Sequence, residues 1–177
     1  TIILKGKSPV NGTVTMPGDK SISHRVAMLA SISPGVSQIT GFASSADCHA
    51  TLACLRRLGI QVESNEERLL IHGRGRYGYQ PVANPVELDA GNSGSTIRML
   101  CGILAAQRFA TVIDGDASLR RRPMRRIIEP LTLMGAQLTA CDQAFAPLKI
   151  EGTRLQPIRY LSPTASAQVK SCVLLAG

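Results

Sequence analysis

The run Pro17-Gly18-Asp19-Lys20-Ser21-Ile22-Ser23-His24-Arg25 places an ammonium, a hydroxyl and a guanidinium within six residues. Lys20 supplies a point charge and Ser21 a hydroxyl donor, while Arg25 can grip an oxyanion with two parallel hydrogen bonds. The pattern of a nucleoside triphosphate loop requires Gly directly before Lys-Ser, but Asp19 stands there. The segment therefore predicts a site for small phosphorylated anions, and the alternative is a capped helix with solvated cations.

Two later segments repeat this arrangement. Gly94-Ser95-Thr96-Ile97-Arg98 and Ser166-Ala167-Gln168-Val169-Lys170 also place small polar residues before a cation and an apolar run. The cations Arg25, Arg98 and Lys170 are 73 and 72 residues apart. Each segment has the form of a helix N-terminus entering a core. Such termini present unpaired N–H groups that bind phosphates and carboxylates, so three of them around a pseudo-threefold axis are expected to converge on one ligand.

The elements that must position these termini recur in the same order. The pattern predicts helices to residue 33, over 48–58, to residue 106 and over 123–134, and strands at 37–41, 60–63, 68–72, 111–113, 137–139 and 148–151. Gly59 and Gly135 are expected to end the second helix of each unit, Pro123 to begin the later one and Pro130 to kink it. The chain is thus expected to be an α/β (α+β) protein with two full units of about 75 residues and the start of a third. A half-built third unit and the lack of an initial Met suggest a fragment of a longer chain.

Other polar residues are assigned less specifically. Gly91 and Gly94 would let an anion approach the backbone closely. Among Arg120, Arg121, Arg122, Arg125 and Arg126, three or four are expected to face solvent, and Arg122 is the one expected in a site. His24 is expected only to pack in the interior. Asp47 fits equally well as a helix N-cap or as a ligand contact.

Composition narrows the class of protein. The 177 residues carry a formal charge of +8, which favours anionic partners. Only six residues are aromatic and none lies in the Arg-rich stretch, so nucleic acid is disfavoured. No apolar run reaches the length of a membrane helix and the start lacks a signal-peptide layout, from which we expect a cytoplasmic protein. Five scattered cysteines indicate reduced thiols, with Cys101 and Cys172 in the core, and the three histidines have no zinc-ligand spacing.

Four motifs in order resemble the 5-enolpyruvylshikimate-3-phosphate synthases, the 3-phosphoshikimate 1-carboxyvinyltransferases. They are residues 17–25, 91–98 (GNSGSTIR), 121–124 (RRPM) and 166–171 (SAQVKS). The resemblance implies a fold of two similar domains, each of three βαβαββ units around a pseudo-threefold axis. It places residues 1–15 with the other domain and 16–177 in the first domain, truncated in its third unit.

The resemblance also implies a reaction. The enolpyruvyl group of phosphoenolpyruvate moves to the 5-hydroxyl of shikimate 3-phosphate and phosphate leaves, without metal or organic cofactor, in the pathway to chorismate and the aromatic amino acids. Carried over by motif, Lys20 is catalytic and touches both substrates. Shikimate 3-phosphate would be held by Lys20, Ser21, Arg25, Ser166, Ala167 and Gln168. Phosphoenolpyruvate would be held by Lys20, Gly94, Arg122 and Gln168, with Gly94 also beside the herbicide glyphosate.

Two departures and three alternatives accompany this interpretation. Ala167 stands where some members have Ser, and Ser95 where Thr is common. The family is usually monomeric, and its proton-transfer residues lie in a C-terminal domain that this chain lacks, so the fragment itself is expected to be inactive. The alternatives are a non-catalytic domain for anionic metabolites, a nucleic-acid-binding module, and a relative of UDP-N-acetylglucosamine enolpyruvyltransferase. The last typically has Lys-Asn at Lys20-Ser21 and a reactive Cys in the loop that here spans residues 114–123, which contains none.

Overall fold

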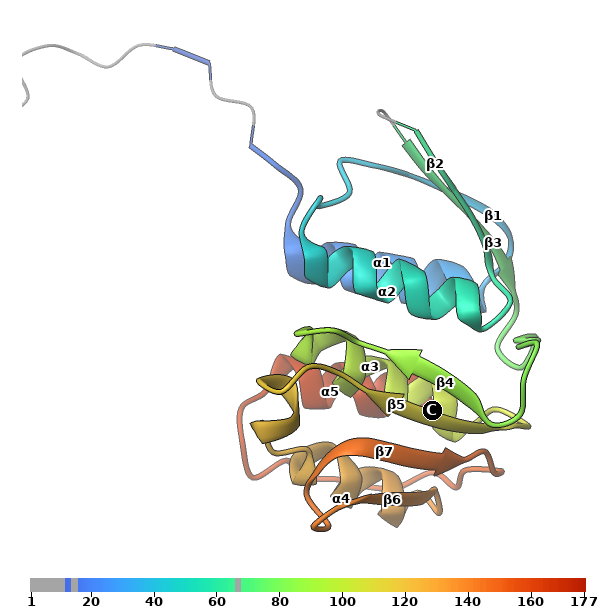
Figure 1. Cartoon of the computed structure of the whole chain (residues 1–177), viewed down its shortest axis with the longest axis vertical. Helices are drawn as coiled ribbons and strands as arrows, with labels where there is room; N and C mark the ends of the chain where they lie inside the picture. Colours follow the sequence, from blue (N-terminus) through green and yellow to red (C-terminus); the bar gives the residue numbers. More distant parts are fainter. Residues whose placement is uncertain (1–11, 14–15, 66–67) are drawn as a thin grey trace, which may run out of the picture.

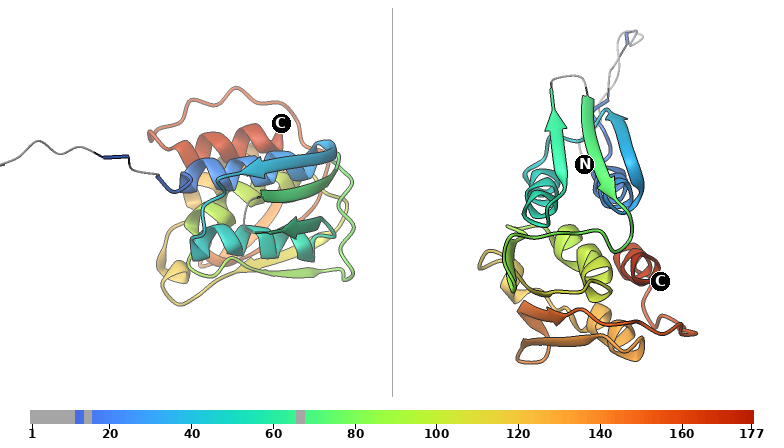
Figure 2. Two further views of the ribbon diagram at one scale, coloured as in Figure 1. Left: turned by 90° about the horizontal axis from the view of Figure 1, so that it is seen from above. Right: turned by 90° about the vertical axis from the view of Figure 1, so that its right-hand side faces the viewer.

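The computed structural model describes residues 12–13, 16–65 and 68–177. Most of the segment 1–15, which was assigned to another domain, lies outside the described residues. The described residues form two sheets, and four of their five α-helices, α1, α2, α3 and α5, gather in the middle of the molecule (Figures 1 and 2). The longest described helix has 13 residues, and none is both long and apolar enough to cross a membrane.

The first unit begins with α1 (Lys20–Ile32) and continues through β1 (Pro34–Thr40), α2 (Ala46–Arg57), β2 (Gln61–Ser64) and β3 (Arg68–Arg74). The sheet order is β1-β3-β2, antiparallel throughout. Leu52, Leu55 and Leu58 are all buried, as their helical spacing predicted. Gly59 follows the second helix with φ +85°, a conformation that favours glycine, so the predicted end of this helix is confirmed.

The second unit is β4 (Val86–Asp89), α3 (Gly94–Ala105), β5 (Ala110–Asp114), a 3₁₀ turn η1 (Leu119–Arg121), α4 (Arg125–Leu133), β6 (Gln137–Cys141) and β7 (Phe145–Glu151). Its sheet order is β4-β5-β7-β6, with β4 parallel to β5 and the other pairs antiparallel. This is a complete βαβαββ unit. A further helix, α5 (Ala167–Ala176), matches the opening helix of a third unit.

Two features of the second unit differ from the sequence-based prediction. Strand β4 was not predicted, because four residues with alternating burial give too short a periodic signal. Pro123 does not begin a helix: α4 starts at Arg125, after the 3₁₀ turn and an extended Arg122. Pro130 lies inside α4, and the kink expected there stays a prediction.

Helix α3 is the centre of the core, since eleven of its twelve residues are buried. Its closest neighbour is α5, and Gly102 makes this approach possible. A β-carbon at Gly102 would overlap the backbone carbonyl of Cys172. The α3–α5 contact therefore requires glycine at this position, and it sets how closely the third helix N-terminus approaches the second.

Candidate functional site

The N-termini of α1, α3 and α5 are built alike. Each begins after a side chain that caps one backbone N–H: Asp19 accepts from Ile22 N at 2.7 Å, Ser93 from Thr96 N at 3.1 Å, and Ser166 from Val169 N at 3.4 Å. The other N–H groups of each first turn have no partner within the helix. Three positive helix ends are thus available to an anion, if they lie together.

Side-chain hydrogen bonds bring these three termini together. Gln168 in α5 donates to Ser95 Oγ of α3 at 3.0 Å, and its Oε1 accepts from Arg98 Nη1 at 3.1 Å. Arg25 in α1 donates from Nε to Ser171 Oγ at 2.9 Å and from Nη2 to the Ala167 carbonyl at 3.4 Å, both in α5. The sequence-based expectation that the termini converge agrees with this arrangement.

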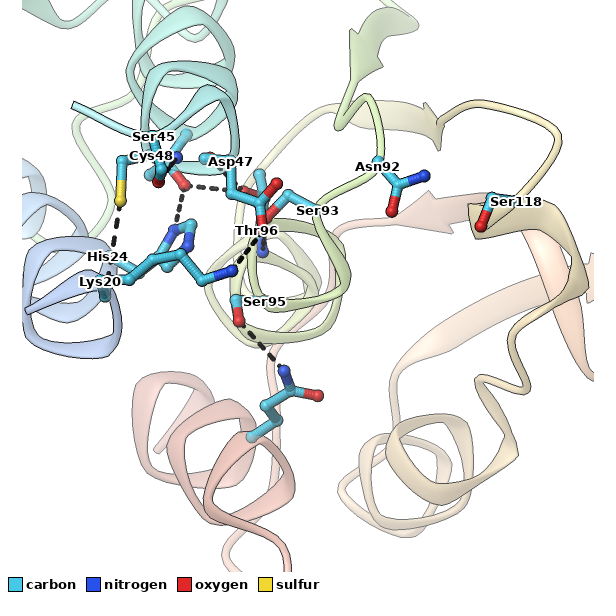
Figure 3. Close-up of polar contacts among 12 residues, drawn as sticks. Lys20, His24, Ser45, Asp47, Cys48, Asn92, Ser93, Ser95, Thr96 and Ser118 are labelled. Atoms are coloured by element: carbon cyan, nitrogen blue, oxygen red, sulfur yellow. Dashed lines mark hydrogen bonds and ion pairs between the residues drawn. The ribbon is translucent and has the colours of Figure 1, made fainter. Parts of the chain in front are cut away.

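Lys20 projects from the first turn of α1 to Asp47 of α2. Its Nζ lies 2.8 Å from Asp47 Oδ2, and both side chains keep contact with solvent (Figure 3). The hydrogen bond and the negative charge of Asp47 raise the pKa of Lys20, so the ammonium is charged. Ser45 caps α2, and Asp47 lies in its first turn, so the N-cap alternative for Asp47 was wrong. Its carboxylate instead holds the ammonium in place.

Gly94 is the first residue of α3 and lies against two guanidinium groups. A β-carbon at Gly94 would be 2.5 Å from Arg98 Nη1 and 3.5 Å from Arg122 Nη1. Arg98 is only 4% exposed, although charged side chains are rarely buried without a pair. Burial and the neighbouring Arg126 and Arg122 charges lower its pKa to about 10. An anion near Gly94 would relieve this repulsion.

Arg122 enters the site from the loop before α4. Its Nη2 donates to Asn92 Oδ1 and, at 3.4 Å, to Ser118 Oγ. Asn92 in turn donates to Asp116 at 2.7 Å. Figure 3 shows Asn92 and Ser118, the two partners of Arg122, on neighbouring loops. The guanidinium is thus held by neutral oxygens, which leave its charge available to a ligand.

The rest of the Arg-rich stretch behaves as predicted. Arg120, Arg121 and Arg125 are exposed, whereas Arg122 and Arg126 are half-buried. Arg120 forms an ion pair with Asp114 at 2.5 Å. Three of the five arginines therefore lie on the surface, within the predicted range.

The expectation that the cysteines are reduced thiols, with Cys101 and Cys172 in the core, is confirmed. Cys101 and Cys172 are buried, and burial raises the pKa of Cys172 to about 12, so neither is a ready nucleophile. All five cysteines are free thiols. Within the described ranges, no group of three or more His, Cys, Asp or Glu side chains is placed to hold a metal ion.

Sequence reasoning missed several contributors. Arg98 was used only to align the repeat, yet it contacts Gln168 and lies beside Gly94. The repeat could have indicated Arg98 as a site residue, because Arg25, at the matching position of the first unit, was assigned to the site. Asn92 as a partner of Arg122 had no sequence signal, since 30 residues separate them. His24 is buried as expected, but it also forms a hydrogen bond to Thr51.

Comparisons with known proteins agree with this architecture. The family model described as EPSP synthase (3-phosphoshikimate 1-carboxyvinyltransferase) matches residues 4–177. The 3-phosphoshikimate 1-carboxyvinyltransferase of Solibacter usitatus is 54% identical over 95% of this chain and 39% of that protein, and the one of Methylococcus capsulatus is 52% identical over 95% and 38%. A solved EPSP synthase from Acinetobacter baumannii superposes with a TM-score of 0.87 at 45% identity, covering 94% of this chain and 38% of that one. The chain spans about two fifths of the length of these relatives, and it belongs to the EPSP synthase family.

Proposed function

We propose that this chain forms one wall of the cleft in which the enolpyruvyl group of phosphoenolpyruvate is transferred to the 5-hydroxyl of shikimate 3-phosphate. The observation that carries the proposal is the convergence of three capped helix N-termini, joined by Gln168 and Arg25. Both substrates are polyanions, and helix N-termini with adjacent guanidiniums stabilise such charges. Residues 16–177 would form the first of two domains, with residues 1–15 belonging to the other.

In this proposal shikimate 3-phosphate lies between α1 and α5. Its phosphate would meet the N-terminus of α5, at Ser166, Ala167 and Gln168, and the side chains of Ser21 and Arg25. Two Arg25 donors currently bond to the carbonyls of Ser21, at 2.9 Å, and Ala167, at 3.4 Å. A phosphate oxygen is a stronger acceptor than a neutral carbonyl, so the guanidinium can exchange these bonds for charge-assisted ones.

Phosphoenolpyruvate would lie between α1 and α3. Lys20 would contact both substrates, held by Asp47 where it can neutralise charge that develops during addition and elimination. Gly94 would allow close approach to the α3 N-terminus, and Arg122 and Gln168 would bind the anion from the opposite side. The guanidinium groups of Arg98 and Arg122 beside Gly94 support this placement. Burial, and then the charges of Arg126 and Arg122, lower the pKa of Arg98, so an anion bound there would stabilise its charged form.

This part alone is proposed to bind the substrates but not to turn them over. Among the described residues near the site, the carboxylate of Asp19 accepts from the Ile22 N–H, and that of Asp47 is paired with Lys20. The carboxylate of Asp116 accepts from Asn92 and from the Leu119 N–H. Each is engaged within the protein rather than placed as a general acid or base. The complete enzyme would act in the cytoplasm, as a monomer without metal or cofactor, and would not bind nucleic acid.

The proposal is tested by titration calorimetry of the chain with shikimate 3-phosphate, with duplex DNA as the control ligand. Arg25→Ala should weaken shikimate 3-phosphate binding by about tenfold or more, because it removes a charge-assisted bidentate contact. Arg154→Ala is the matched control, since Arg154 lies in the cavity at the C-terminal ends of α3 and α5. Equal losses in both variants, or preferential binding of DNA, would contradict the proposal.

A further inference from the structure

A buried chain of side-chain hydrogen bonds runs behind the site. His24 Nδ1 lies 2.7 Å from Thr51 Oγ1, Thr51 Oγ1 lies 2.7 Å from Thr96 Oγ1, and Thr96 Oγ1 lies 2.7 Å from Ser93 Oγ (Figure 3). All four residues are fully buried, at 0% exposure. Hydrogen bonds without competing water hold their geometry more firmly than exposed ones.

These hydrogen bonds link three helices. His24 belongs to α1, one turn after Lys20; Thr51 belongs to α2; and Thr96 belongs to the first turn of α3. Ser93 is the N-cap of α3, and Thr96 Oγ1 also lies 3.3 Å from the Asp47 carbonyl of α2. The chain therefore joins the helix that carries Lys20 to the helix that begins at Gly94.

Proton counting selects one tautomer of His24. The Asp47 carbonyl can only accept, and Thr96 has one hydroxyl proton to donate there or to Ser93. Thr51 must then donate to Thr96, and His24 Nδ1–H must donate to Thr51. This leaves His24 Nε2, which has no partner, as a bare lone pair. The opposite direction would bury an unpartnered N–H donor, which proteins tolerate less well than an unpartnered acceptor.

We propose that His24 is a positioning residue. As the neutral Nδ1–H tautomer it donates the first hydrogen bond of the series through Thr51 and Thr96. This series of hydrogen bonds fixes the N-terminus of α3 against α1. This inference rests on the proposed function, and it adds that the hydrogen bonds of His24 affect the binding of phosphoenolpyruvate but not that of shikimate 3-phosphate. The hydrogen bonds set the position of Gly94, which is proposed to contact phosphoenolpyruvate only, relative to α1. The contacts of α1 with α5 around the proposed shikimate 3-phosphate position are made separately by Arg25.

The binding test compares variants of the chain by NMR titration. Phosphoenolpyruvate is titrated with shikimate 3-phosphate present at saturation, and shikimate 3-phosphate is titrated alone. Thr96→Val and His24→Leu should raise the Kd for phosphoenolpyruvate about fivefold and leave that for shikimate 3-phosphate within about twofold. His24→Asn should rescue binding, because its amide can donate from the position of Nδ1. Equal losses for both ligands, no loss, or failure of the Asn variant to rescue would overturn the inference.

The matched control is Thr111→Val. Thr111 is also a buried threonine, but its hydroxyl has no hydrogen-bond partner and it lies in β5. Its substitution should leave both Kd values within about twofold of wild type. A loss of phosphoenolpyruvate affinity in this variant equal to that of Thr96→Val would mean that any buried Thr→Val change has this effect, and would overturn the inference.

A second readout does not depend on either ligand. Long-range ¹⁵N–¹H spectra of the imidazole near neutral pH should show a neutral His24 protonated at Nδ1, and Thr51→Val should shift its ¹⁵N signals. An Nε2–H tautomer, or ¹⁵N signals that do not change in Thr51→Val, would overturn the proposed series of hydrogen bonds. If the wild-type chain bound neither substrate while His24 showed the expected tautomer, the proposed function would fail and the hydrogen-bond chain would stand.

Discussion

The Nη1 atom of Arg98 occupies the space beside Gly94 in which a β-carbon would lie, 2.5 Å from its ideal position. The same Nη1 donates to Gln168, so a side chain at position 94 would disturb the link between α3 and α5 as well as the space for a ligand. Position 94 therefore lies against the α3–α5 link as well as the proposed ligand position.

Gly94→Ala tests this relationship. The guanidinium can move aside, and Ala favours the helix, so the free energy of unfolding should change by less than about 1 kcal/mol. The Kd for phosphoenolpyruvate should rise about tenfold, since the displaced Arg98 and the new methyl group both intrude on the α3 N-terminus. Urea denaturation and NMR titration measure the two quantities. Gly12→Ala, where nothing lies within 4 Å of the added carbon, is the control. Unchanged affinity in the Gly94 variant would contradict the placement.

Gly102→Ala, unlike Gly94→Ala, should lower the free energy of unfolding substantially. Its β-carbon would overlap the Cys172 carbonyl, which is backbone and cannot rotate away. Separating α3 from α5 should cost about 2–3 kcal/mol in the free energy of unfolding, as for other overpacked cores. Urea denaturation checks this, and a cost below about 0.5 kcal/mol would show that the two helices are not in close contact.

The stability of the chain should fall as the pH drops below about 6.5, the value for an unfolded histidine. Burial lowers the pKa of His24, and the charges of Lys20 and Arg25 add to this effect while Asp47 opposes it. The unfolded chain therefore binds the proton more readily than the folded chain, so the stabilising contribution is complete above pH 6.5 and is lost as the pH falls through the folded-state pKa.

Urea denaturation of wild type and His24→Asn across this pH range isolates the His24 contribution. The difference between them should depend on pH below about 6.5 and become constant above it. His49→Gln, at an exposed position, should retain the wild-type dependence. A parallel pH dependence in wild type and His24→Asn would show that His24 does not contribute.

Thr111→Val should be neutral or stabilising by up to about 1 kcal/mol. Thr111 is 1% exposed and its hydroxyl has no partner, so the folded protein carries a desolvated polar group that Val would replace at similar volume. Urea denaturation gives the change directly. A loss of more than about 1 kcal/mol would mean that the hydroxyl has a bound partner in solution.

Much of the fold could be predicted because the repeat made each element visible twice. The helix that ends before Gly59 and the one that ends before Gly135 carry local signals that tertiary contacts did not override. Strand β4 escaped prediction because its pairing with β5 depends on residues about 25 positions away. Pro123 was assigned to a helix by its propensity at a first turn, but the 3₁₀ turn ahead of it moved the helix start to Arg125.

The candidate site residues could be picked out from sequence motifs, but the residues they contact could not. Lys20, Arg25 and Gly94 were singled out from the repeated helix starts, and Arg122 from its place directly before Pro123. Their roles in binding stay predictions. Their partners are distant in sequence, as with Lys20 and Asp47, and no local pattern reports such contacts. Burial of Arg98 also could not be inferred, because arginine is usually exposed.

The central claim is that three helix N-termini form one anion site, and NMR titration of the ¹⁵N-labelled chain with shikimate 3-phosphate tests it most directly. The account predicts saturable shifts of backbone N–H signals at residues 20–25, 94–98 and 166–171, moving together with one Kd. Absence of saturable shifts would contradict it. So would shifts confined to the cavity near Arg76, Arg108 and Arg154, at the opposite ends of α3 and α5.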